Sequence, residues 1–398
     1  MYNKKIELNS YKNFFIFIIL VPCIYLRGFD SMMPFNETQY LFNYEFEFLK
    51  RGFLGEILRL TFDEVNTQII YFFSQFFLIL LLIILYKKFF LDFNRKSNVY
   101  KLIFSITVIT SPLTLQHFIV DIGRQDIVNL VITFQALFLI DKLYKRTFFL
   151  ASLILFISSI MLLIHEVSFF LFIPMIFGFW FYKSSYKNIL NLQFLLFLFI
   201  ILITALISTH GLSSKFSYIE LNKYMLEKYI FTLETEKAVF FKSDTLMVLF
   251  RDLFNSYDPN VEHGIIGDMI KHTFKTRVLI NHVFILTLMS PIFFIVYKLF
   301  REFLKVSNFK AKILLISALS PTFMFFLGYD HLRWYSIIFT NIFIVVFYLS
   351  NQKSIYQKII LENVKKYKRL YLYLIPASLL LGPAGHVTTF DILAKFVY

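Results

Sequence analysis

Four short stretches of this sequence combine acids, arginines and histidines, and each adjoins a long apolar run. Side chains of these types transfer protons, hold cations or bind phosphate groups in proteins. The candidates are Glu37 and Arg51 in the first stretch, Asp121, Arg124 and Asp126 in the second, His165 and Glu166 in the third, and Asp330, Arg333 and Trp334 in the fourth.

The residue types divide these candidates into two roles. A carboxylate or an imidazole can take a proton from an attacking hydroxyl, and a carboxylate can also hold a divalent cation. A guanidinium can grip phosphate oxygens with two parallel hydrogen bonds. The predicted catalytic residues are Glu37, Asp121, Asp126, His165 and Glu166, and the predicted substrate-binding residues are Arg51, Arg124, Asp330, Arg333 and Trp334.

The first two stretches also have a purely structural interpretation. The acids of residues 27–67 could simply solvate a helix at the membrane interface. Asp121 and Arg124 are three positions apart, so they could form a surface ion pair that ends a helix.

The other two stretches have structural alternatives as well. Arg333 could reach lipid head groups with its long side chain, and Trp334 fits an aromatic belt at the interface. His165 and Glu166 either face water at a tight turn or lie buried in the bundle. Buried ionisable groups at membrane depth usually face a cavity, which favours a functional role for this pair.

The apolar runs between these stretches predict the elements that position them. The chain has 398 residues, of which 58% are hydrophobic and 20% aromatic, which exceeds the apolar share of ordinary soluble domains. A helix needs about 20 apolar residues to cross the hydrocarbon core, where it satisfies its own backbone hydrogen bonds. We therefore predict an all-α, polytopic membrane bundle that forms one domain over residues 1–398. Its eleven expected spans are residues 13–26, 68–86, 99–118, 127–143, 148–164, 167–182, 189–209, 279–297, 311–327, 334–350 and 370–383.

The distribution of lysine and arginine predicts how these spans are oriented. With the N-terminus in the cytoplasm, every segment expected on the inner side has a positive net charge, and no segment on the outer side does. Basic inner loops are the established signature of membrane topology. The net charge of +14 therefore indicates orientation and attraction to anionic lipid head groups, and does not indicate nucleic-acid binding.

Two of the expected outer segments are long. Residues 27–67 form the first outer loop and residues 210–278 form a larger one, and we expect amphipathic helices at the membrane interface in both. The single cysteine, Cys23, excludes an intrachain disulfide and a cysteine-based metal site. The sequence has no P-loop and no Rossmann glycine fingerprint, so ATP-driven or NAD-linked chemistry has no support.

In its layout the chain resembles two related groups of membrane enzymes. The first is the Wzy-type polymerases of O-antigen and capsule, which are rich in Phe, Ile and Leu and have large outer loops with important arginines. The second is the glycosyltransferase C superfamily, which has an acid in the first outer loop, a second acid in a later outer loop and an Arg–aromatic pair at a late span. Here Glu37-Thr-Gln-Tyr40, Asp121 or Asp126, and Arg333-Trp334 could fill those places.

Residue types and resemblance together predict a glycan-building enzyme of the bacterial inner membrane. It would polymerise polyprenyl-diphosphate-linked oligosaccharide repeat units at the outer face, with Asp121, Asp126, Glu37 or His165 as the base. The expected partners are the polyprenyl-linked glycan and membrane lipids, with a flippase and a chain-length regulator. No cofactor is expected, and a divalent cation stays open. The alternatives are a glycosyltransferase C-type enzyme that adds one sugar from a polyprenyl-phosphate donor, a flippase for lipid-linked oligosaccharide, and a non-enzymatic scaffold.

Overall fold

The computed structural model describes residues 2–28, 32, 34–45, 48–94, 98–185, 188–210, 283, 286–327 and 331–383. Every regular element within these ranges is a helix, which confirms the all-α class. The large outer loop expected at residues 210–278 lies outside the described residues beyond position 210.

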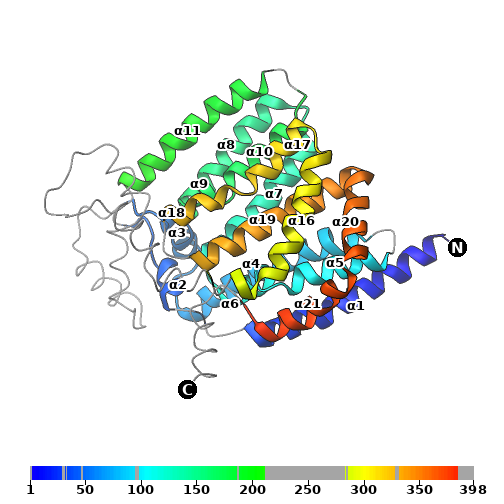
Figure 1. Ribbon diagram of the computed structural model, residues 1–398. Coiled ribbons are helices and arrows are strands. Elements are labelled where there is room, and N and C mark those ends of the chain that lie inside the picture. Colours follow the sequence, from blue (N-terminus) through cyan, green and yellow to red (C-terminus); the bar gives the residue numbers. More distant parts are fainter. Residues whose placement is uncertain are drawn as a thin grey trace.

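The helices form one bundle (Figure 1). They are α1 (Tyr2–Gly28), α2 (Pro34–Gln39), α3 (Gly52–Thr61), α4 (Thr67–Leu85), the π-helix η1 (Tyr86–Asp92), α5 (Val99–Thr110), α6 (Leu115–Val120), α7 (Gln125–Leu143), α8 (Thr147–Ile164), α9 (Ser168–Leu171), α10 (Ile173–Lys183), α11 (Ile189–His210), α16 (Ser290–Val306), α17 (Phe309–Ser317), the 3-10 helix η3 (Ser320–Phe323), α18 (Met324–Leu327), α19 (His331–Gln352), α20 (Ser354–Lys366) and α21 (Lys368–Leu381).

Long apolar helices make this chain a membrane protein. Within the described ranges, five helices are long and apolar enough to cross a bilayer, and a bent pair raises the number to six. Two shorter apolar helices, Tyr11–Leu26 and Ser168–Lys183, add to them. A helix overlaps each of the eleven expected spans. The number of crossings and the orientation stay predictions.

Asparagine side chains start several of these helices. The side-chain oxygens of Asn66, Asn98 and Asn308 accept backbone N–H groups in the first turns of α4, α5 and α17, at 3.0, 2.9 and 3.0 Å. An asparagine at this position satisfies a donor that the helix itself leaves unpaired. The polar residues that flank the apolar runs therefore fix where the helices begin.

Three expected spans are interrupted. Residues 99–118 divide into α5 and α6. The other two breaks lie beside each other. Residues 167–182 divide into α9 and α10 at Phe172, and residues 311–327 bend by 43° near Pro321. The carbonyl of Phe170 accepts a hydrogen bond from Ser320, and the carbonyl of Leu171 accepts one from Asn341, both at 2.7 Å. Side chains thus satisfy carbonyls that the break at Phe172 releases, as a lipid-embedded chain requires.

The first outer loop forms an end of the bundle. It contains α2 and α3, which lie far from the labelled N-terminus in Figure 1. Helix α3 buries Leu54 and Leu58 and exposes Ile57 and Leu60, so it is amphipathic as expected. At the opposite end, residues 351–369 were expected to form a loop, but they contain α20. Its buried Ile360 and Val364 recur with helical spacing within a basic segment, which explains the difference.

Candidate functional site

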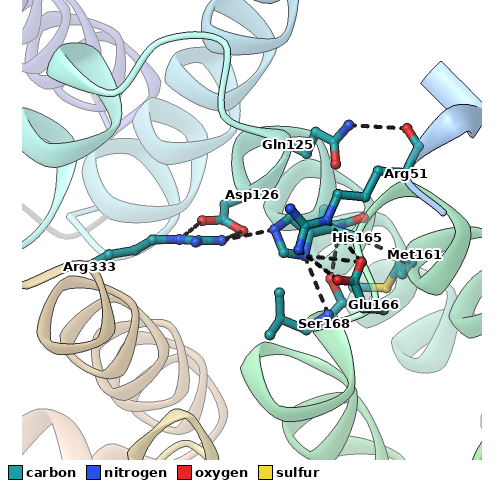
Figure 2. A network of polar contacts seen from close by, with 10 residues as sticks. Arg51, Gln125, Asp126, Met161, His165, Glu166, Ser168 and Arg333 are labelled. Atoms are coloured by element: carbon teal, nitrogen blue, oxygen red, sulfur yellow. Dashed lines mark hydrogen bonds and ion pairs between the residues drawn. The ribbon is translucent and has the colours of Figure 1, made fainter. Parts of the chain in front are cut away.

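An ion pair between Arg333 and Asp126 lies at the centre of the site (Figure 2). Arg333 is in the first turn of α19 and Asp126 is in the first turn of α7. Both Nε and Nη2 of Arg333 donate to the carboxylate of Asp126, and the Nη2–Oδ1 distance is 2.7 Å. The side chains are only 5% and 2% exposed, so this two-point contact is made away from water.

A second ion pair of the same kind lies close by. Arg51, which precedes α3, donates from Nε and Nη2 to the two carboxylate oxygens of Glu166, at 3.1 and 2.6 Å. Glu166 lies in the turn between α8 and α9, and its side chain is 1% exposed. This pair connects the first outer loop to the turn between α8 and α9.

His165 connects the two ion pairs. Its Nε2 atom is 3.3 Å from Nη2 of Arg333, and its Nδ1 atom is 3.9 Å from Oε2 of Glu166. The backbone N–H of Val167 also points at Nδ1, at 3.3 Å. A neutral imidazole has one lone-pair nitrogen and one N–H, so it cannot accept from both Val167 and Arg333. His165 can therefore adopt either of two tautomers. A side chain that transfers a proton needs this ability.

The backbone at Arg51 is shaped to aim this side chain. Arg51 has φ +63°, the one left-handed non-glycine residue in the described part of the chain. Such a conformation costs energy and persists where the surroundings hold it. The glycine at 55 helps, because a Cβ there would come within 2.0 Å of the Phe42 carbonyl oxygen. The close approach of α3 to the loop before it thus fixes the direction from which Arg51 reaches Glu166.

A third ion pair forms at the turn between α6 and α7. Nε of Arg124 donates to Oδ1 of Asp121 at 3.0 Å, which confirms the pairing expected from their spacing. Asn36 of α2 donates to the same carboxylate at 3.4 Å and to the carbonyl of Ile122 at 3.0 Å. Gly123 takes a positive φ of +90° in this turn, a conformation that favours glycine. The Asp121 side chain is 3% exposed, so the pair is not a surface contact.

Burying this many charges costs free energy, so their presence calls for a functional explanation. An ion loses several kcal/mol of hydration on burial, and pairing only partly restores this, so apolar residues would often be as stable. Ionisable groups within membrane helices are therefore usually functional. Asp126, His165, Glu166 and Arg333 are each less than 5% exposed. The buried alternative for His165 and Glu166 is thus the correct one.

Several buried polar atoms next to this network have no partner within the described residues. They include the indole N–H of Trp334 and the side-chain oxygens of Gln125 and Asn36. Buried polar groups are nearly always hydrogen-bonded, so these atoms can each take a further partner, such as a water molecule or a substrate group. Trp334 is 3% exposed and its ring lies 4.7 Å from the guanidinium carbon of Arg333. It is therefore a wall of the site and not a belt residue facing lipid.

Two of the predicted residues stand apart from this network. Glu37 of α2 is half-buried, and burial raises the pKa of its carboxyl above the usual value. Its neighbour Asn36, rather than Glu37 itself, contacts Asp121. Asp330 lies outside the described residues.

Neutral polar residues that the sequence did not single out complete the network. Gln125 donates to the backbone carbonyl of Arg51 at 3.4 Å, and Asn129 donates to the hydroxyl of Ser168 at 2.6 Å. An asparagine inside the apolar run 127–143 is a signal that could have been used. Within the parts of the chain that the structure describes, no group of three acids, histidines or cysteines is arranged to hold a metal ion.

The fold and the site define a class: a helical membrane protein with a buried, charged network at one end of its bundle. Comparisons with protein-family models, with curated proteins and with solved structures find no match for this chain. The meaning of the network must therefore come from its chemistry.

Proposed function

We propose that this protein is a membrane-embedded glycosyltransferase that polymerises polyprenyl-diphosphate-linked repeat units at the outer face of the bacterial inner membrane. One observation carries the proposal: Arg333–Asp126 and Arg51–Glu166 are buried ion pairs of identical two-point geometry, joined by His165, in a protein of apolar helices. Such a site offers cations for a diphosphate and bases for a hydroxyl close together.

The reaction needs the charges that this network holds. The acceptor hydroxyl oxygen bonds to the anomeric carbon of the donor sugar, and the bond from that carbon to the diphosphate oxygen breaks. The diphosphate leaves with the electron pair, so negative charge grows on it and a cation must balance that charge. The proton of the hydroxyl must pass to a base within hydrogen-bond reach.

An exchange of partners on Arg333 would supply both groups at once. A guanidinium binds phosphate oxygens in the same two-point geometry that it uses for a carboxylate. When a donor diphosphate replaces Asp126 on Arg333, the released carboxylate is free to accept the proton of the acceptor hydroxyl. His165, in contact with Arg333, relays or orients that proton, and the indole N–H of Trp334 adds a donor to the diphosphate.

The orientation of the chain belongs to this proposal. The segments flanking the network, 27–67, 119–126, 165–166 and 328–333, are those whose charge places them outside the cytoplasm. With eleven spans and a cytoplasmic N-terminus, the network faces the side where surface glycans grow. A flippase would deliver the lipid-linked repeat unit there, and a chain-length regulator would limit the product.

Surface glycan length tests this function. In a strain that lacks this gene, glycan should carry single repeat units, and a plasmid copy should restore long chains. Copies with Arg333→Lys or Asp126→Asn should fail, because neither keeps the two-point ion pair. Glu302→Gln, which removes an exposed Lys305 contact of 2.7 Å, is the matched control and should complement fully.

Other outcomes would point to the other candidate functions. Normal long chains in the deletion strain would contradict polymerisation. Chains of normal length that lack one sugar would instead identify a single-sugar transferase. Movement of lipid-linked oligosaccharide across vesicles without formation of a glycosidic bond would identify a flippase.

A further inference from the structure

A polar cavity lies at the other end of the helices that carry the charged network. It has a volume of about 340 Å³ and is lined by residues of η1, α7, α10, α19 and α20. Along α7, its Asp141 is 15 positions from Asp126, which corresponds to about 22 Å of helix. The cavity is therefore separate from the charged network and plays no part in the proposed transfer.

One helix that lines this cavity departs from regular α-helical geometry. After Leu85 the backbone of α4 changes from α-helix to the seven-residue π-helix η1, which carries Lys88, Phe89 and Asp92 into the lining. Stretches of π-helix are rare and concentrate at functional sites, because the wider turn redirects side chains at a cost in stability. The π-helix is an observation independent of the cavity itself, and both indicate a binding site here.

Two ion pairs lie at the mouth of the cavity, and they differ in their N–O distances. Lys88 and Asp92 are 3.6 Å apart and remain 44% and 35% exposed. An exposed pair of this kind contributes little stability, so it opens readily to a ligand. Asp141 is held more firmly, by Lys183 at 2.5 Å and by the hydroxyl of Tyr348 at 3.1 Å.

Aromatic rings form the inner wall of the cavity. Phe89 stacks on Phe347 with ring centroids 4.0 Å apart, and Phe179 meets the edge of Tyr348 at the same distance. Phe138, also in the lining, is half exposed on the outside of α7. The site thus joins an apolar wall, continuous with the lipid-facing surface, to a rim that carries both signs of charge.

We propose that this cavity binds the head group of a zwitterionic phospholipid. The phosphate group of the lipid binds Lys88 and replaces Asp92 as its partner. The ammonium group then binds the carboxylate of Asp92, and Asp141 lies nearby as a second acid. Because Asp141 is already paired with Lys183, Lys88 and Asp92 are left as one base and one acid, which match the two opposite charges of a zwitterion. The aromatic wall accommodates the start of an acyl chain, and the location at the ends of membrane helices makes a lipid the source of the head group.

Binding by the purified full-length protein tests this site. The probes are short-chain phosphatidylethanolamine, phosphatidylglycerol and soluble phosphoethanolamine, and the readout is the dissociation constant together with the shift in unfolding temperature. Phosphatidylethanolamine should bind at least tenfold more tightly than either of the others. Lys88→Gln and Asp92→Asn should each weaken it about tenfold, which corresponds to about 1.4 kcal/mol.

Two further variants keep the test decisive. Asp92→Lys makes the rim cationic, so its preference should move to phosphatidylglycerol, a gain that misfolding cannot produce. Glu362→Gln breaks the exposed 3.8 Å pair with Lys358 on α20, outside this cavity, and should leave binding unchanged. Equal or tighter binding of phosphatidylglycerol to the unaltered protein would overturn the proposal. Equal affinity for soluble phosphoethanolamine would overturn the lipid as the ligand. Glycan polymerisation can fail or persist independently of either result.

Discussion

Arg333 and Asp126 are 207 positions apart in the chain, and their ion pair joins the first turns of α19 and α7. Asp126→Asn removes the carboxylate that faces Arg333 in a dry site, and we expect it to destabilise the protein by about 3–5 kcal/mol. The exposed Glu302–Lys305 pair is the control, because its loss should cost at most about 1 kcal/mol. Unfolding midpoints in detergent for the two variants measure the difference. Equal small losses would mean that the pair is not buried as described.

A double substitution separates stability from function at the same pair. Asp126→Asn with Arg333→Gln removes both charges, so the unfolding free energy should recover part of what the single variants lose. Glycan polymerisation should stay absent, because neither the cation nor the base is restored. Recovery of long glycan chains in the double variant would show that the pair is only structural.

Only some of the ion pairs in the site follow from the spacing of residues in the sequence. Asp121 and Arg124 are three apart in sequence, and they do pair. Arg333, in contrast, binds Asp126 of a helix that is distant in sequence. Sequence proximity predicts pairing along one turn, whereas a contact between α19 and α7 depends on how the bundle packs. The sequence could therefore name the charged residues, but not the partners that come from another helix.

Helix α3 positions Arg51, which immediately precedes it, for its contact with Glu166. Gly55→Ala would bring a Cβ within 2.0 Å of the Phe42 carbonyl and 2.6 Å of the Tyr40 carbonyl, and backbone atoms cannot move aside cheaply. We expect a loss of about 1–3 kcal/mol from overpacking, together with loss of polymerisation as Arg51 is displaced from Glu166. Thermal unfolding and glycan length measure the two effects.

The control for this element is on the same helix. Leu60→Ala shortens a side chain that is 71% exposed, so stability should change by no more than about 0.5 kcal/mol and glycan chains should stay long. If Gly55→Ala behaved like Leu60→Ala, the tight contact of α3 with the preceding loop would not position the site.

Element existence was easier to predict than element continuity. Run length and hydropathy located a helix at each expected span, because an apolar run of this length has few other stable structures in lipid. The proline at 174 predicts a kink in the run 167–182, and a break occurs there, at Phe172. The break near Pro321 was not predicted. The break at Phe172 depends on side chains from elsewhere in the chain, Ser320 and Asn341, which donate to the carbonyls of Phe170 and Leu171. The partners that stabilise such a break cannot be read from its own run.

For the whole molecule, the direction in which the helices cross determines what the charged network can reach. The eleven-span topology places Glu64, between α3 and α4, outside the cytoplasm and Lys145, between α7 and α8, inside it. The chain has one cysteine, so Cys23→Ser gives a background into which Glu64→Cys or Lys145→Cys can be placed singly. A membrane-impermeant maleimide should label Glu64→Cys in intact cells with the outer membrane opened. It should label Lys145→Cys only after the inner membrane is broken.

The labelling pattern connects topology to function. Between the two positions, α4 and the α5–α6 stretch are long and apolar enough to cross, and the eleven-span prediction adds α7. Three crossings would place the two positions on opposite sides. Equal labelling of both in intact cells would mean that one of these helices does not cross. The network at the start of α7 would then lose its assigned side, since positive inner loops determine orientation only when every span between them crosses. The cysteine-free parent must stay unlabelled, and long glycan chains in each variant show that its topology is the working one.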